Sequence, residues 1–179
     1  MCIRDSSRSF AQAYAGHQFG HFTKLGDGRA IIIGEHLNEN KQRFDIQLKG
    51  SGRTPYSRNG DGKATLKAML REYLISEAIH YLNIPSSRSL AIIKTGEPVY
   101  RETVEEGAIL ARVMKSHIRV GTFEYASYFG SVDDLKALTS YTINRLYPEI
   151  KENENPVIDF LDKVMINQIE LVLNWMRVG

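Results

Sequence analysis

One long helical pattern, set between short strand patterns, limits most strongly how this chain folds. Residues 63–82 carry apolar side chains at helical spacing, with Asp61 as a candidate N-cap and Pro85 after the end. The apolar stripe consists of Leu66, Met69, Leu70, Tyr73, Leu74, Ala78, Tyr81 and Leu82. A stripe of this kind has to be covered by another layer of structure. We therefore expect this helix to pack against a sheet.

Strand patterns surround the helix. Residues 29–34 are rich in β-branched side chains, and residues 43–48 alternate apolar with polar side chains. The polar residues 38–41 between them predict the turn of an antiparallel hairpin. Three further strands are predicted after the helix, at residues 89–94, 99–103 and 108–114.

The pattern becomes helical from Phe123 onward. Ser131, with Asp133 and Asp134 behind it, is a typical start for a helix that ends near Pro148. Residues 157–178 form another helical pattern, whose apolar faces we expect to be exposed and prone to aggregation. The order β-β-α-β-β-β followed by helices predicts an α+β fold.

Composition excludes several classes of protein. The chain has 179 residues, of which 42% are hydrophobic and 25% charged, as in an ordinary globular domain. Its apolar runs are too short to span a membrane, so we expect no membrane partner. The single cysteine, Cys2, excludes an intramolecular disulfide and a cysteine-based zinc cluster.

Charge is spread unevenly, although the net charge is only +2. Residues 43–71 hold seven basic side chains against two acidic ones, and this block includes the loop-like, glycine-containing residues 51–62. That combination suits a phosphate-bearing ligand, while a plain basic surface remains the alternative. Few aromatic residues accompany the block, which argues against a nucleic-acid partner.

Two features in and around this block suggest nucleotide chemistry. Gly26 and Gly28 form a G-x-G before a strand, a pattern that brings backbone amides close to phosphates but is also that of a plain hairpin turn. Lys49 ends a strand and Glu72 lies on the next helix, the pairing with which kinases hold phosphates. The alternatives are a surface lysine at a strand end and a surface glutamate near Lys63 or Lys67.

Two arginines complete the candidate site. Arg112 lies in an apolar strand pattern, and Arg119 follows in the turn at residues 117–121. Both side chains are suited to bidentate phosphate binding, and the alternative is an internal ion pair with Glu72 or Glu124. His17 and His21 are four residues apart, but neighbouring glycines disfavour the helix that a metal pair would need.

At this point the sequence resembles the selenoprotein O family. The motifs are Gly16-His17-Gln18-Phe19-Gly20, Leu25-Gly26-Asp27-Gly28-Arg29-Ala30, Gln47-Leu48-Lys49-Gly50, Thr54-Pro55-Tyr56-Ser57-Arg58, Gly60-Asp61-Gly62, Arg71-Glu72-Tyr73-Leu74, Ser76-Glu77-Ala78 and the run from Ser116 to Glu124. They extend from about Ser9 to the end. The resemblance implies a protein-kinase-like fold and the activity of a protein adenylyltransferase. Such a protein would bind ATP in an inverted orientation with Mg²⁺ or Mn²⁺ and transfer AMP to Ser, Thr or Tyr hydroxyls of proteins.

The resemblance also implies roles and boundaries. ATP would be bound by Gly26, Gly28, Arg29, Lys49, Asp61, Gly62, Arg112 and Arg119, with Glu72 as the ion-pair partner of Lys49. We expect a tail or sequencing scar at residues 1–8, a kinase-like N-lobe (an antiparallel sheet with one αC-like helix) at 9–120, and the first helices of a C-lobe at 121–179.

One departure from the family pattern matters for activity. Family members continue past the segment matched by Trp175–Gly179 into the motifs that hold the proposed base and the metal ligands. No catalytic base and no metal ligand is therefore assigned here, and we expect this chain alone to be inactive. The alternative is a non-catalytic ATP-binding regulator. The opening residues lack a targeting pattern, which favours a bacterial cytoplasmic location.

Overall fold

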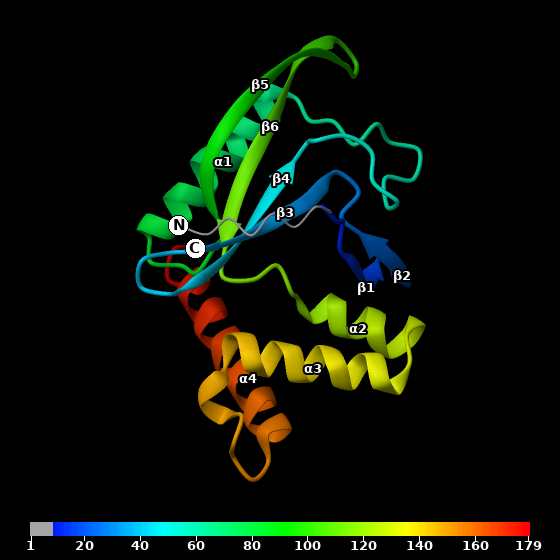
Figure 1. Ribbon diagram of the computed structural model, residues 1–179. Coiled ribbons are helices and arrows are strands. Elements are labelled where there is room, and N and C mark those ends of the chain that lie inside the picture. The colour runs from blue at the N-terminus through cyan, green and yellow to red at the C-terminus, as the bar shows by residue number, and fades with distance from the viewer. Residues whose placement is uncertain (1–8) are drawn as a thin grey trace.

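The computed structural model describes residues 9–179, so the predicted tail at residues 1–8 lies outside the described residues. Figure 1 shows an α+β architecture, as predicted. Its elements are β1 (Ala13–Gln18), β2 (His21–Gly26), β3 (Ala30–Leu37), β4 (Arg43–Lys49), α1 (Leu66–Tyr81), β5 (Arg88–Tyr100), β6 (Val104–Met114), α2 (Val120–Phe129), α3 (Val132–Leu146), the 3₁₀ turn η1 (Pro148–Ile150) and α4 (Pro156–Met176).

The main sheet is antiparallel and has the strand order β3-β4-β6-β5. The predicted hairpin is confirmed, since β3 pairs with β4 from Ala30 opposite Lys49 to Leu37 opposite Arg43. The prediction of separate strands at 89–94 and 99–103 was wrong. These residues form the single strand β5, whose pairing with β6 shifts register between Lys94 and Pro98. Proline is tolerated there because β5 is an edge strand.

Helix α1 lies along one face of the sheet (Figure 1). The buried core between them consists of Ala64, Met69, Ala108 and Leu110. Most of the predicted apolar stripe is not buried, because α1 turns Met69 and Ser76 inward and leaves Leu70 and Leu74 exposed. The predicted Asp61 cap was also wrong. Thr65 caps α1, and its hydroxyl accepts a hydrogen bond from the Ala68 amide.

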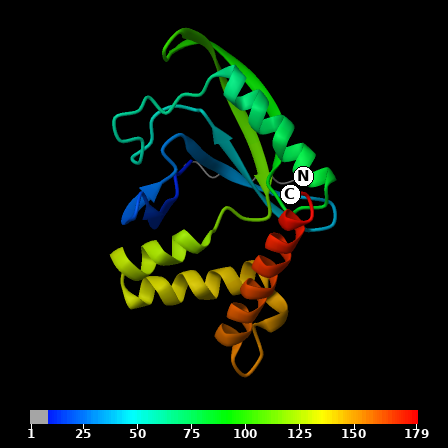
Figure 2. The ribbon, with the colours of Figure 1, turned by 180° about the vertical axis from the view of Figure 1, so that it is seen from behind.

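A second, two-stranded sheet was not predicted. Strands β1 and β2 form a tight hairpin, and α2 packs beside β1. Helix α2 begins three residues before the predicted Phe123. The predicted start of α3 is confirmed, because Ser131 and Asp134 form a reciprocal capping box. Helices α2, α3 and α4 form the helical part of the structure. Figure 2 shows α4 running from its start at Pro156 up to the end of the main sheet.

Helix α4 leaves many large apolar side chains exposed, as predicted for residues 157–178. They are Val157, Ile158, Leu161, Met165, Ile166, Ile169, Val172, Leu173, Trp175 and Met176. No helix among residues 9–179 is both long and apolar enough to cross a membrane.

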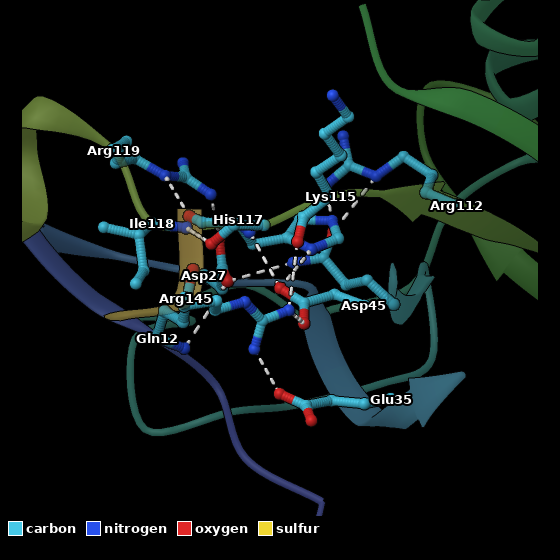
Figure 3. Close-up of polar contacts among 12 residues, drawn as sticks. Gln12, Asp27, Glu35, Asp45, Arg112, Lys115, His117, Ile118, Arg119 and Arg145 are labelled. Carbon is cyan, nitrogen blue, oxygen red and sulfur yellow. Dashed lines mark hydrogen bonds and ion pairs between the residues drawn. The ribbon is translucent and has the colours of Figure 1, made fainter. Parts of the chain in front are cut away.

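A buried charge cluster ties the helical part to the main sheet (Figure 3). Arg145 of α3 contacts Glu35 of β3 and lies 2.5 Å from Asp45 of β4, and the side chains of Arg145 and Asp45 are 6% and 7% exposed. His117 donates its backbone amide to Asp45 at 2.8 Å. Burial alone would raise the pKa of Asp45, but hydrogen bonds from His117 and the charge of Arg145 outweigh it and lower that pKa. His117 is itself buried in this cluster, with 3% of its surface exposed.

Candidate functional site

The candidate site begins with the ion pair between β4 and α1. Met69 is held in the core, and Glu72 lies on the same face of α1 because it follows three residues later. Its carboxylate therefore meets the sheet, where Lys49 Nζ donates to Glu72 Oε2 at 2.6 Å. This confirms that Lys49 and Glu72 pair, and rules out two separate surface residues.

Arg112 joins this pair from strand β6. Its guanidinium donates to Glu72 Oε1 at 3.2 Å, and a second edge of the guanidinium contacts Gln47, the residue directly opposite on β4. The side chains of Arg112 and Lys49 are only 18% and 19% exposed. Two half-buried cations thus share one carboxylate.

Burial and crowding change the acidity of both cations. Burial lowers the pKa of Lys49, and the nearby charges of Arg112 and Arg29 lower it further, against the opposing effect of Glu72. Burial also lowers the pKa of Arg112. Burial thus disfavours the charged form of both groups, and an anion bound beside them would favour it.

Arg119 approaches the same space from the other side. It precedes α2 and donates to Asp27 Oδ1 at 3.4 Å, and its guanidinium stacks on the Tyr14 ring at 4.3 Å from the ring centre. Of the two partners considered for the arginines, Glu72 is confirmed for Arg112. The partner of Arg119 is Asp27, which the sequence analysis did not consider.

The loop between β4 and α1, residues 50–65, covers the turn between β2 and β3. Thr54 Oγ1 donates to the Asp27 carbonyl at 2.6 Å, and Ser57 Oγ donates to the Gly28 carbonyl at 2.5 Å. Gly62 has φ +68°, and a Cβ there would lie 1.9 Å from the Gly52 carbonyl oxygen, so only glycine fits.

Asp61 of the same loop is held by Arg101. The two side chains make a bidentate contact at 2.8 and 3.0 Å, and the Lys63 amide also donates to Asp61. The hydrogen bonds from Arg101 and from that amide lower the pKa of Asp61 to about 2. Asp61 is therefore ionised over the whole physiological range, but its carboxylate is already engaged.

Seven of the eight predicted binding residues line one cavity of about 530 Å³: Gly28, Arg29, Lys49, Asp61, Gly62, Arg112 and Arg119. Six cations line this cavity against two carboxylates. We call it the cationic cleft. Gly26 instead lines a neighbouring cavity of about 610 Å³ with Lys24, Tyr56 and Arg58. Tyr14, Asp27, Ser57, Lys63 and Arg101 also line the cleft and were not predicted from the sequence.

The cleft offers little to a divalent cation. Of the two carboxylates that line the cleft, Asp61 is engaged by Arg101, and Asp27 by Arg119 and Gln47; Glu72 behind it is engaged by Lys49 and Arg112. No group of three or more His, Cys, Asp or Glu side chains among residues 9–179 is arranged to hold a metal ion. The residues described here therefore do not fit the metal that the resemblance implies. His17 and His21 belong to no such group.

A half-buried, glycine-lined cleft rich in arginine and lysine defines a site for an anion with several charged oxygens. A family model described as protein adenylyltransferase SelO matches residues 2–179, and the chain belongs to that family. The match includes most of residues 1–8, whereas the motifs quoted above begin only near Ser9.

Similar curated proteins are named protein nucleotidyltransferase YdiU. The chain is 59% identical over 177 residues to the one from Pelagibacter ubique, a match that covers 99% of this chain and 37% of the relative. Identity is 60% over 177 residues to the Bacillus mycoides protein, with 99% and 36% covered. It is 61% over 169 residues to the Clostridium perfringens protein, with 94% and 34% covered. The chain thus spans about a third of the length of these relatives.

Proposed function

We propose that the cationic cleft binds ATP, and that the whole protein transfers AMP from ATP to Ser, Thr or Tyr hydroxyls of other proteins. In this reaction the hydroxyl oxygen forms a bond to the α-phosphorus, pyrophosphate leaves, and the hydroxyl proton passes to a base. The names of the family and of its relatives support nucleotidyl transfer. The carrying observation is that Lys49 and Arg112, which both line the cleft, share the single carboxylate of Glu72 behind it.

The proposal assigns electrostatic roles to the residues of the cleft. Lys49, Arg112, Arg119 and Arg29 hold phosphate oxygens, and Gly28 and Gly62 allow the backbone to come close to them. Asp61 keeps the loop at residues 50–65 in place through Arg101. Gly26 belongs to the same nucleotide-binding turn, but it lines the neighbouring cavity and not the cleft itself. A divalent metal is part of the family chemistry, and we assign no residue of this chain to it.

The architecture also supports a kinase-like assignment. We propose that residues 9–120 form an N-lobe, with α1 in the place of the αC helix, and that residues 121–179 begin a helical C-lobe. Support comes from the antiparallel sheet, its single packed helix and the strand-to-helix ion pair. A bacterial cytoplasmic location belongs to the proposal as well, and rests on the bacterial sources of the relatives.

Binding of ATP is tested with a fluorescent ATP analogue and the 179-residue chain. Lys49→Met should weaken binding at least about tenfold, because a charged partner of the phosphates is lost. Lys94→Met is the matched control, since Lys94 also lies on a strand and pairs with a glutamate, Glu106, but on the exposed surface. Equal affinities of the two variants would refute the assignment of the cleft.

Transfer is tested separately with ATP labelled on the α-phosphate. We propose that this chain alone binds ATP without transferring AMP, because each carboxylate of the cleft contacts a cation or an amide group and none is placed as a base. Label should appear on proteins with a full-length relative and not with this chain. Robust labelling by the chain itself would overturn this part of the proposal.

A further inference from the structure

A row of three polar side chains lies on one face of strand β4, at every second residue. Asp45 contacts the helical part, Gln47 lies in the middle, and Lys49 reaches Glu72. Gln47 is fully buried, with 0% of its surface exposed. Because a buried amide has to find partners for both its oxygen and its nitrogen, the surroundings of Gln47 are informative.

The two ends of the Gln47 amide face opposite charges. Its oxygen accepts hydrogen bonds from the Arg112 guanidinium, with Nε at 3.0 Å, and its nitrogen donates to Asp27 Oδ2 at 3.1 Å. A guanidinium can only donate and an ionised carboxylate can only accept. The amide of Gln47 offers both an acceptor and a donor and so satisfies both neighbours, which together fix its orientation.

Gln47 thereby separates two groups that attract each other. Asp27 is 6% exposed, and its negative charge acts on Arg112. Without the amide between them, Arg112 would be free to turn toward Asp27 and form a direct ion pair. Because Asp27 also lines the cleft, such a pair would neutralise the guanidinium inside it and compete with any phosphate bound there.

The contacts of Gln47 also join both sides of the cleft. A continuous chain of side-chain hydrogen bonds runs through Gln47. One end of this chain consists of Lys49, Glu72 and Arg112, and the other end consists of Asp27 and Arg119. Figure 3 shows Asp27 between Arg119 and the Arg112 side of this network. Gln47 is the central member, although it does not itself line the cavity.

We propose that Gln47 is a positioning residue of the nucleotide site, which insulates Arg112 from Asp27 and so keeps Arg112 and Arg119 available to different phosphates of one polyphosphate chain. This inference rests on the proposed binding of ATP. It assigns a role to a side chain that touches no nucleotide and acts only through Arg112 and Asp27. Gln47 should therefore affect how strongly phosphates are bound, and leave the binding of the nucleoside part unchanged.

The experiment compares the affinities of AMP, ADP and ATP for the 179-residue chain by calorimetry. In the unmodified chain, affinity should rise with each added phosphate. In Gln47→Leu, ATP should bind about tenfold to a hundredfold more weakly, while AMP changes by less than about threefold. Thr142→Val is the control, because it removes a side-chain hydrogen bond from a residue that is also buried, at 2% exposed, and that does not line the cleft. It should lower stability and leave the phosphate series unchanged.

Gln47→Glu gives a second readout with almost unchanged side-chain shape. The introduced carboxylate would lie against Asp27 and Arg112, within the wider group of Lys49, Glu72 and Arg119. At neutral pH it repels Asp27 and neutralises Arg112, so ATP binds weakly. As the pH falls from about 8 to about 5.5, a proton shared between the introduced carboxylate and Asp27 should restore a hydrogen-bond donor toward Asp27. The deficit in ATP affinity relative to the unmodified chain should then shrink.

The outcomes separate the inference from the function on which it rests. If affinity in the unmodified chain does not rise with phosphate number, the proposed function fails and the inference with it. If it does rise, but Gln47→Leu keeps the same ratio of ATP to AMP affinity, Gln47 is only a structural residue and the inference alone is wrong. If Gln47→Leu does not fold, a deficit of Gln47→Glu that is the same at every pH overturns the inference.

Discussion

Glycine at position 26 is explained by a neighbouring ring, and this can be tested by rescue. Gly26 ends β2, and its φ lies outside the left-handed region, so alanine is allowed by the backbone. A Cβ at this position would lie 2.1 Å from Cγ and 2.3 Å from Cδ1 of the Tyr56 ring. The three atoms nearest to that Cβ all belong to Tyr56. The obstacle to a side chain here is therefore one aromatic ring.

The expected loss of stability follows from overpacking of the added Cβ against the Tyr56 ring. Gly26→Ala forces the ring away and should lower the free energy of unfolding by about 1–3 kcal/mol. In a Tyr56→Ala background the obstacle is gone, and the same change should cost less than about 0.5 kcal/mol, because alanine restricts the unfolded chain more than glycine does. The double-mutant cycle should thus show a coupling of about 1–3 kcal/mol between the two positions.

Urea unfolding followed by circular dichroism measures the four proteins of this cycle. Gly16→Ala on the paired strand β1 is the matched control, since its Cβ would meet only the end of the Glu124 side chain at 3.3 Å. That variant should change stability by less than about 0.5 kcal/mol. Equal costs of Gly26→Ala with and without the Tyr56 ring would refute the packing explanation.

Two further predictions concern charged contacts outside the cleft. Arg145→Met removes the partner of two carboxylates from a site where the arginine side chain is 6% exposed, and should lower the free energy of unfolding by about 3–5 kcal/mol in urea titrations. A loss below about 1 kcal/mol would show that the cluster does not join α3 to the sheet. Hydrogen bonds from Arg88 lower the pKa of Glu77 from 4.5 to about 2, so the stability this contact provides is complete above the ordinary value and is lost as the pH falls through about 2. The difference in unfolding midpoint between the unmodified chain and Glu77→Gln should therefore shrink from about pH 5 to about pH 2, and a difference independent of pH would contradict this.

Local sequence patterns correctly predicted those elements whose residues have the usual propensity for a strand, a turn or the start of a helix. The hairpin of β3 and β4 and the start of α3 are of this kind. The β1–β2 hairpin was missed because its turn does not have a typical hairpin sequence. Phe19 and Gly20 occupy the turn with φ of +54° and +82°, a conformation for which Asn-Gly is the usual signal.

Periodicity identified α1 but not the face that α1 buries. The stripe of large apolar side chains is mostly exposed, and the face against the sheet includes Glu72 and Ser76 as well as Met69. Ser76 is buried because its hydroxyl pairs with that of Ser89 at 2.7 Å. A count of apolar residues gives no weight to such polar contacts, so it could not select the buried face.

The candidate site shows a different limit of sequence reasoning. For Arg112 the sequence offered two alternatives, an anion site or an internal ion pair with Glu72 or Glu124, and the structure shows the ion pair with Glu72. The two alternatives do not exclude each other, because Lys49 also binds this carboxylate and one negative charge cannot balance two positive ones. Burial lowers the pKa of both Lys49 and Arg112, and repulsion from neighbouring cations adds to it. A spacing pattern can suggest each contact separately, but only the three-dimensional sharing of Glu72 leaves positive charge available for a phosphate.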